Sequence, residues 1–499
     1  MPRGVPKDGK RKRKRETVKK NEYSSHYVVK VGLKSLLLHH PTLLPIIQTQ
    51  ALEITRIALR LTRFINIFVL RHLENNCDIP LLNQGFIQRI GSVLFGRKSK
   101  TRDDNVNLIN GSVNMDDVII KLRKICEKLS KSINYVAKSL NVNISNMLKF
   151  TLEQRLRKYL RVRMTQLHNG QSIPRSEYRR VVEYIIRKLT FVTPVYDFVK
   201  LPPKELIETI PVLIREVRTL VDAKTDEVID ESFVKNNTNN MLKFYWHVQQ
   251  FLINNDMKSF ALLPLSHFKC RCMEIGTKEL VDMLKQNKQG RQQKGEESTE
   301  LKCNLKCLNV GTKKIQIDSI RTDGIQASVV LRHQLVGNHK NNKAKESKGQ
   351  KEAKKRKKET SMNEGAEYLV GIDPGIVTLV SCVDSDGKKW ELSNKTYRHL
   401  SHHSKNSKRL LKYKAEWNEM NEKNLDELQN SIKQAGVPTS GLFLEHINSV
   451  LKVEDDLLNF YCTPKVKRLN WDSYIMRDKT IANVMNDFRK RANGRSMLI

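Results

Sequence analysis

Asp373 is the residue whose type and position could do chemistry in this sequence. It ends the apolar run Leu369-Val370-Gly371-Ile372 and stands directly before Pro374-Gly375. One interpretation is structural, because an aspartate before Pro-Gly stabilises its own turn through its side chain. The other is chemical, because a carboxylate fixed at the end of a strand is a hard oxygen ligand for Mg²⁺. Such a metal can bind a phosphodiester and promote its hydrolysis. Both the structural and the chemical interpretation stay open at this point.

The charge of the chain indicates the kind of partner that it binds. Its 499 residues contain 90 Lys and Arg against 53 Asp and Glu, a formal net charge of +37. Self-repulsion of this size is costly unless a polyanion neutralises it, so we expect nucleic acid as the main partner. Apolar residues make up 39% of the chain, which excludes wholesale disorder. Eight cysteines are too few for a disulfide scaffold and indicate a reducing compartment.

Four arginines interrupt the most apolar helical stretch, residues 54–73. Its apolar residues recur at steps of three and four, which is typical of an amphipathic helix, and the arginines argue against a membrane span. Arg56, Arg60 and Arg63 share the opposite face of this helix. They form either a solvated face or a row of guanidinium groups spaced to contact phosphates.

Further Lys and Arg side chains gather in the basic helix 144–163, at the turn near residue 321 and after residue 397. The candidate nucleic-acid-binding residues there are Arg155, Lys158, Arg161, Arg321, Arg398, Lys405, Lys408 and Arg409. His399, His402 and His403 are expected to form a basic loop with Lys405, Lys408 and Arg409. We expect phosphate contact or plain solvation from these histidines rather than metal binding, because no fourth ligand is near in sequence.

Composition divides the chain into six segments and predicts a multidomain α+β fold. Residues 1–25 form a disordered basic tail with six consecutive Lys/Arg at 10–15, which indicates a nuclear import signal, a nucleic-acid arm or a solubilising tail. Residues 26–41 begin with a strand, residues 42–258 are mostly helical, and residues 259–337 are rich in β-structure. Residues 338–365 are a disordered basic linker with a second import signal at 354–358. Residues 366–499 contain strands followed by basic helices, and we expect a nuclear location.

Alternation and turn residues predict two groups of strands. Residues 313–333 form two strands around the turn Arg321-Thr322-Asp323-Gly324. The residues expected to face inward are Ile315, Ile317, Val329 and Leu331. Residues 368–393 form three short strands, joined by turns at 373–375 and 386–387.

The motif Gly371-Ile372-Asp373-Pro374-Gly375, opening three strands, resembles the first RuvC-type motif of the RNase H fold. The order of the segments 27–38, 260–265, 320–324 and 371–375, followed by 397–401, resembles the Fanzor proteins, eukaryotic relatives of the transposon-encoded TnpB nucleases. The resemblance implies a Mg²⁺-dependent DNA endonuclease whose partners are a guide RNA and a target DNA. In such enzymes base pairing reads the sequence and the protein holds the backbone, which suits a chain that is rich in Lys and Arg.

The resemblance also assigns roles to the predicted segments. The helices of 42–258 correspond to a recognition lobe, inserted into a β-rich wedge built from the segment 27–38 and the strands of 260–335. Residues 366–499 correspond to an RNase H-like, RuvC-type domain in which Asp373 is a catalytic metal ligand.

The catalytic pattern of this family is incomplete here. Two or three carboxylates must converge on two metals, and the best local candidate for a second is Glu445. We expect Glu454, Asp455 and Asp456 to lie on a solvated helix face instead. No C-x-x-C pair occurs, so zinc is not expected at Cys270, Cys272, Cys303 and Cys307.

We therefore expect the chain to correspond to a nuclease truncated after its first RuvC-type motif, with little or no activity alone. The alternative is a non-catalytic nuclear RNA- or DNA-binding protein of a nucleolar or ribosome-assembly type.

Overall fold

The structure is a computed structural model with a mixed α+β fold in which helices dominate. It describes residues 27–96, 100–111, 113–123, 130–168, 174–190, 208–265, 267–289, 315–333, 368–375, 377–492 and 497–498. The basic tail, the basic linker, Cys303 and Cys307 lie outside the described residues.

The elements follow the expected order of a strand, helices, strands and helices. The first part contains β1 (Tyr27–Gly32), α1 (Leu33–Leu36), α2 (Leu43–Glu74), α3 (Gln84–Phe95), α4 (Lys100–Asn110), α5 (Asp116–Leu122), α6 (Ser130–Leu167), α7 (Arg175–Thr190), α9 (Thr209–Val221), α10 (Glu231–Asn236) and α11 (Thr238–Ile253). The second part contains β2 (Met273–Gly276), α12 (Thr277–Gln289), β3 (Ile315–Thr322), β4 (Gln326–His333), β5 (Tyr368–Pro374), β6 (Thr378–Asp384), β7 (Lys389–Ser393), α14 (Asn394–Leu400), α15 (His403–Asn421), α16 (Leu425–Asn430), α17 (Ser440–Tyr461), α18 (Pro464–Ala492) and β8 (Met497–Leu498).

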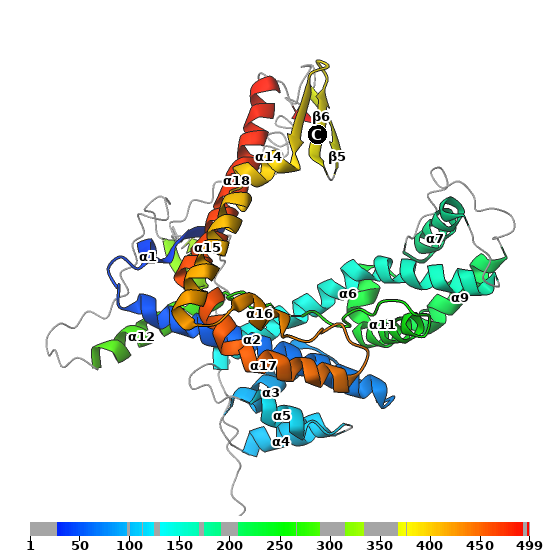
Figure 1. Ribbon diagram of the computed structural model, residues 1–499, viewed down its shortest axis with the longest axis horizontal. Helices are drawn as coiled ribbons and strands as arrows, with labels where there is room; N and C mark the ends of the chain where they lie inside the picture. Colours follow the sequence, from blue (N-terminus) through cyan, green and yellow to red (C-terminus); the bar gives the residue numbers. More distant parts are fainter. Residues whose placement is uncertain are drawn as a thin grey trace, which may run out of the picture.

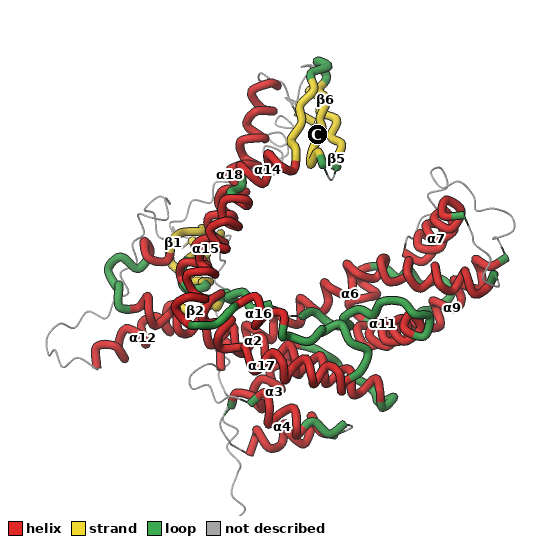
Figure 2. The backbone as a smooth tube through the Cα atoms, viewed as in Figure 1, coloured by secondary structure: helices red, strands yellow, loops and turns green. Residues whose placement is uncertain are grey.

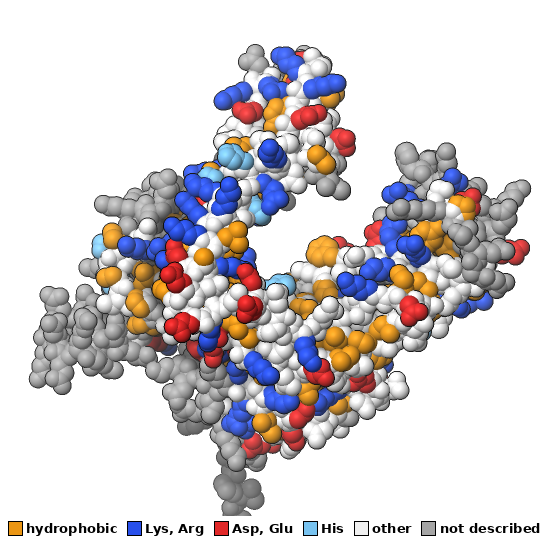
Figure 3. Space-filling view, viewed as in Figure 1, with side chains coloured by type: hydrophobic (Ala, Val, Ile, Leu, Met, Phe, Trp, Pro, Cys, Tyr) orange, Lys and Arg blue, Asp and Glu red, His pale blue; other side chains and the backbone are white. Residues whose placement is uncertain are grey.

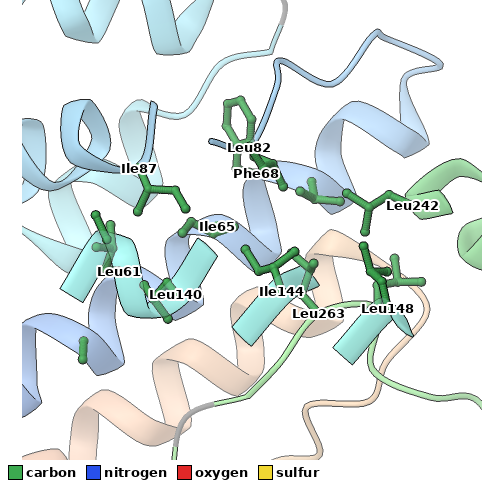
Figure 4. Close-up of a cluster of buried hydrophobic side chains, with 14 of the residues drawn as sticks. Leu61, Ile65, Phe68, Leu82, Ile87, Leu140, Ile144, Leu148, Leu242 and Leu263 are labelled. Atoms are coloured by element: carbon green, nitrogen blue, oxygen red, sulfur yellow. The ribbon is translucent and has the colours of Figure 1, made fainter. Parts of the chain in front are cut away.

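Helix α2 forms the centre of the molecule. It contacts α3, α5, α6 and α17, and nearly every side chain between Ile54 and Leu70 is buried, on all faces of the helix. Figure 4 shows part of this core, where Leu61, Ile65 and Phe68 of α2 lie among side chains of α3, α6 and α11. The predicted amphipathic helix forms, but its polar side is not exposed, because other elements cover it as well.

The first sheet joins segments that are far apart in the sequence. Its strand order is β1-β4-β3-β2, and β1 pairs antiparallel with β4 so that Val29 lies opposite Val329. Val329 and Leu331 are fully buried, Ile317 is half-buried, and the side chain of Ile315 is outside the description. This confirms the strand pair around residues 321–324, and the N-terminal strand lies in the same sheet.

The predicted strands were less accurate at the ends of this sheet. Residues 259–276 were expected to be rich in β-structure, but only β2 is a strand there. The first strand ends at Gly32, and a short helix follows it. The turn between β3 and β4 forms as expected, with Gly324 at a φ of 89°. The carboxylate of Asp323 accepts hydrogen bonds there from the backbone N–H groups of Ile325 and Gln326, at 3.0 and 3.1 Å.

The second sheet has the order β7-β6-β5-β8. Strands β5, β6 and β7 form the predicted antiparallel meander, and β8 adds to β5 in the parallel direction. Helix α18 covers one face of the sheet, where Tyr368, Val370 and Cys382 pack against Phe488 and Ala492. Strand β8 was not expected, because residues 397–499 read as entirely helical.

Two arms leave the central body around α2 and α17 (Figure 1). One arm consists of α18, α14 and part of α15, and it carries the second sheet at its tip. The other contains α6, α7, α9 and α11 (Figure 2). The space-filling view shows a wide hollow between the two arms (Figure 3).

Candidate nucleic-acid interface and candidate metal ligand

Asp373 lies near the end of β5, on the face of the sheet opposite α18. It pairs with Ser381 of β6, which in turn pairs with Glu391 of β7, so these three side chains share one face. The Asp373 side chain is exposed, and it has no hydrogen bond or ion pair among the described residues, which exclude Ile376 in its own turn. An exposed carboxylate at a strand end is free to bind a cation, but it supplies only one ligand side chain.

The structure does not bring Glu445, the expected second carboxylate, to Asp373. Glu445 lies on α17 in the central body, whereas β5 lies at the tip of the α18 arm (Figure 1). Glu445 is exposed and pairs with Lys433 at 2.6 Å. Within the described part of the chain, no group of three or more His, Cys, Asp or Glu side chains is placed to hold a metal ion. The described residues therefore do not make up the ligand set of a two-metal site.

The arginine row of α2 is buried against α17 in an ion-pair network. Glu454 of α17 receives all three arginines, at 3.5 Å from Arg56 Nε, 3.0 Å from Arg60 Nε and 3.4 Å from Arg63 Nη1. Arg56 also contacts Asp455 at 2.6 Å. Burial lowers the pKa of Arg63 to about 10, against the opposing effect of the Glu454 charge.

These contacts correct two expectations about charged faces. The three arginines are neither a solvated face nor free for phosphates, because their guanidinium groups are already paired inside the protein. The side chain of Glu454 is 1% exposed, so it does not belong to a solvated face. The sequence holds a signal for this, because Glu454 lies within the apolar stripe of α17, one turn from Val450 and from Leu458.

Arg155 of α6 also has a structural role rather than the expected phosphate contact. Its guanidinium lies over the rings of Tyr245 and Phe260, at 3.9 and 4.2 Å from their centroids, and donates to the Ala261 carbonyl at 2.8 Å. The residue is 5% exposed, and burial lowers its pKa to about 10. A cation held between two aromatic rings joins α6 to α11 and to the loop after it.

Arg155→Ala should therefore lower stability without changing the electrostatics of nucleic-acid binding. We expect a loss of about 2–4 kcal/mol in the free energy of unfolding, because the cation–π contacts and the side-chain packing disappear together. Urea denaturation measures this loss. The salt dependence of RNA binding should stay the same, and a flatter dependence would instead place Arg155 at the interface.

Three other predicted contacts are exposed and stay candidates. Lys158 and Arg161 lie three residues apart on α6, without an ion pair among the described residues. Arg321 of β3 is exposed and pairs with Glu274 of β2 at 3.2 Å.

The largest group of predicted contacts lies together on α14 and α15. Ser393 begins α14 by accepting a hydrogen bond from the Thr396 backbone N–H at 3.1 Å, which places Arg398 on a helix. Lys405, Lys408 and Arg409, which were expected in a basic loop, lie on helix α15. His402 was expected to be solvated or to contact phosphate, but its side chain already has a partner in the protein. Its Nδ1 lies 2.9 Å from a carboxylate oxygen of Asp472 on α18.

Four exposed cations of α15 form one helix face, which we call the α15 basic face. Its members are Lys405, Lys408, Arg409 and Lys412, at positions i, i+3, i+4 and i+7. The three lysines have no ion pair among the described residues. Sequence reasoning missed Lys412, although its spacing from Lys405 places it on the same face, and it also missed the exposed Lys395 on α14. Figure 3 shows Lys and Arg side chains along this part of the arm.

Comparison with known proteins adds no family to these observations. No family model matches the chain, and no curated protein matches it. None of the described helices is long and apolar enough to cross a membrane.

Proposed function

We propose that this chain is a nucleic-acid-binding protein of the RNA-guided, Fanzor/TnpB-like type, with little or no DNA-cleaving activity of its own. The α15 basic face carries this proposal. Like charges at steps of three and four residues destabilise a helix unless an anion neutralises them, and no carboxylate does so here for its three lysines among the described residues. A phosphate backbone supplies such anions at regular spacing.

The arrangement of the two sheets supports the finer assignment. The first sheet is assembled from β1 and β2–β4, with α2–α11 inserted between them in sequence, as proposed for a wedge interrupted by a recognition lobe. The second sheet places Asp373 at the end of a central strand, as proposed for a RuvC-type domain. Mg²⁺ would bind there through Asp373, with low affinity because one carboxylate is a poor site. We place the protein in the nucleus because of its two basic import-type segments.

RNA binding by the purified chain at increasing salt tests this proposal. Affinity should fall steeply between 50 and 200 mM salt, because each neutralised phosphate releases a counterion. A salt-independent affinity would contradict the proposal. The RNA that copurifies with the chain separates the alternatives, since a short transposon-end RNA supports the proposed type and ribosomal RNA supports a nucleolar or ribosome-assembly protein.

Asp373→Ala should leave RNA affinity unchanged, because a single exposed carboxylate among 90 basic residues contributes little to binding. It should also leave unchanged a cleavage rate that is already close to background. Filter binding and a Mg²⁺-dependent cleavage assay on guide-matched DNA measure both. Cleavage by the native chain that Asp373→Ala abolishes would show that a working metal site exists.

A further inference from the structure

Two cysteines from distant parts of the sequence meet beside α2. Cys270 precedes β2, and Cys462 follows the last turn of α17. Cys462 is buried against Leu59 and Leu458, and Cys270 packs against the same small cluster. Both are free thiols, so the cluster holds the pair in its reduced form.

The surroundings of the pair favour a thiolate on Cys270. The hydroxyl of Thr55 lies 3.7 Å from its sulfur, and Lys467 of α18 lies close enough to act through its charge. Lys467 is 2% exposed and donates to the Asp323 carbonyl at 2.9 Å, so its ammonium group is fixed in place. Interaction with the Cys462 thiol, with smaller contributions from Lys467 and Thr55, lowers the pKa of Cys270 to about 7, although burial and the nearby Asp323 charge oppose this.

Cys270 is also accessible to a small reagent. It lines a cavity of about 420 Å³ together with Cys272, Tyr135, His267, Lys269 and Arg271. The two sulfurs thus differ, since Cys270 lines this cavity, whereas Cys462 is buried and does not line it. The pKa of the Cys462 thiol is raised, because it shares its proton with Cys270 and is buried.

We propose that Cys270 and Cys462 form a peroxide-sensitive thiol pair that closes to a disulfide. The Cys270 thiolate attacks one oxygen of hydrogen peroxide, the O–O bond breaks, and hydroxide leaves, which takes up a proton to give water. Cys270 is now a sulfenic acid. The Cys462 sulfur attacks the Cys270 sulfur, its thiol proton is lost, and the sulfenic oxygen leaves as a second water. Two thiols and one peroxide therefore give one disulfide and two waters.

A Cys270–Cys462 disulfide would link two parts of the fold. One is the segment before β2, and the other is the junction between α17 and α18. Since α18 carries the second sheet, oxidation would fix the base of that arm to the central body. The inference does not depend on the proposed nucleic-acid function.

Peptide mapping of the native chain after treatment with one equivalent of hydrogen peroxide tests the proposal. We expect one cross-linked peptide pair containing Cys270 and Cys462, two hydrogens lighter than the separate peptides. Recovery of Cys270 and Cys462 as free thiols, or a disulfide between Cys270 and Cys272, would overturn it. This measurement needs no variant, so it decides the question even if a substitution prevents folding.

Two variants and a control test the roles of the neighbours. In Cys462→Ser the sulfenic acid at Cys270 has no partner, so dimedone should label Cys270. Lys467→Met should move the midpoint of the pH–rate profile for peroxide above about 7, because the thiolate loses a nearby positive charge. Cys382→Ser is the control: it should leave the Cys270–Cys462 cross-link and the rate of its formation unchanged, since the Cys382 thiol is buried against α18. Absence of dimedone labelling in a folded Cys462→Ser chain, or an unshifted profile in a folded Lys467→Met chain, would contradict the mechanism.

Discussion

Glu454→Gln is expected to lower the free energy of unfolding by about 3–5 kcal/mol. The substitution keeps the shape of the side chain but removes the negative charge that Arg56, Arg60 and Arg63 share. Three guanidinium groups would then lie close together, two of them buried, with only partial compensation from Asp455 and Glu53. Urea denaturation followed by circular dichroism measures the loss.

Glu445→Gln is the matched control for this prediction. Glu445 lies on the same helix, but its side chain is about half exposed and pairs with the exposed Lys433. An exposed pair contributes at most about 1 kcal/mol, so this variant should remain close to the native chain. Adding Arg63→Met to Glu454→Gln should recover part of the loss, because it removes one uncompensated charge. Equal stability of the two single variants would show that the buried network does not hold α2 and α17 together.

Neutralising the α15 basic face is expected to weaken RNA binding by roughly 10²–10³-fold near 0.1 M salt. The change is Lys405, Lys408, Arg409 and Lys412 to glutamine. Each lost phosphate contact removes about 0.7 from the salt slope for a single strand and about 0.9 for a duplex, so the slope should flatten by about 3 to 4. Stability should change little, because all four side chains are exposed.

The control removes the same charge from scattered positions. Lys235 and Lys278 lie on α10 and α12, Lys224 and Lys258 lie in two separate loops, and all four are exposed. Their replacement by glutamine lowers the net charge equally but takes away no contiguous face. A similar loss of affinity in both quadruple variants would mean that net charge, rather than the α15 basic face, determines binding.

Local patterns predicted the strands well because turn chemistry and alternation are local properties. The Asp323-Gly324 turn and the meander that begins at Tyr368 are examples. Arg56, Arg60 and Arg63 show what such patterns cannot predict. Periodicity identifies the helix face that these arginines share, but not the helix that packs on it. Strand β8 pairs through only two residues, Tyr368↔Met497 and Leu369↔Leu498, which is too short to leave a pattern. Of the α14–α15 cations, Arg398, Lys405, Lys408 and Arg409 were found from charge alone, whereas Lys395 and Lys412 were missed. Arg155 was misassigned because its two aromatic neighbours come from elsewhere in the chain.

The pairing of β1 with β4 has a consequence for how the protein is made. The partners Val29 and Val329 are about 300 residues apart in sequence. At roughly 5–20 residues per second, β1 leaves the ribosome about 15–60 s before its neighbour exists. During that interval its hydrogen-bonding edge is open to other chains, and closing so long a loop is slow. Production of the folded protein should therefore depend on chaperones that shield this strand during synthesis.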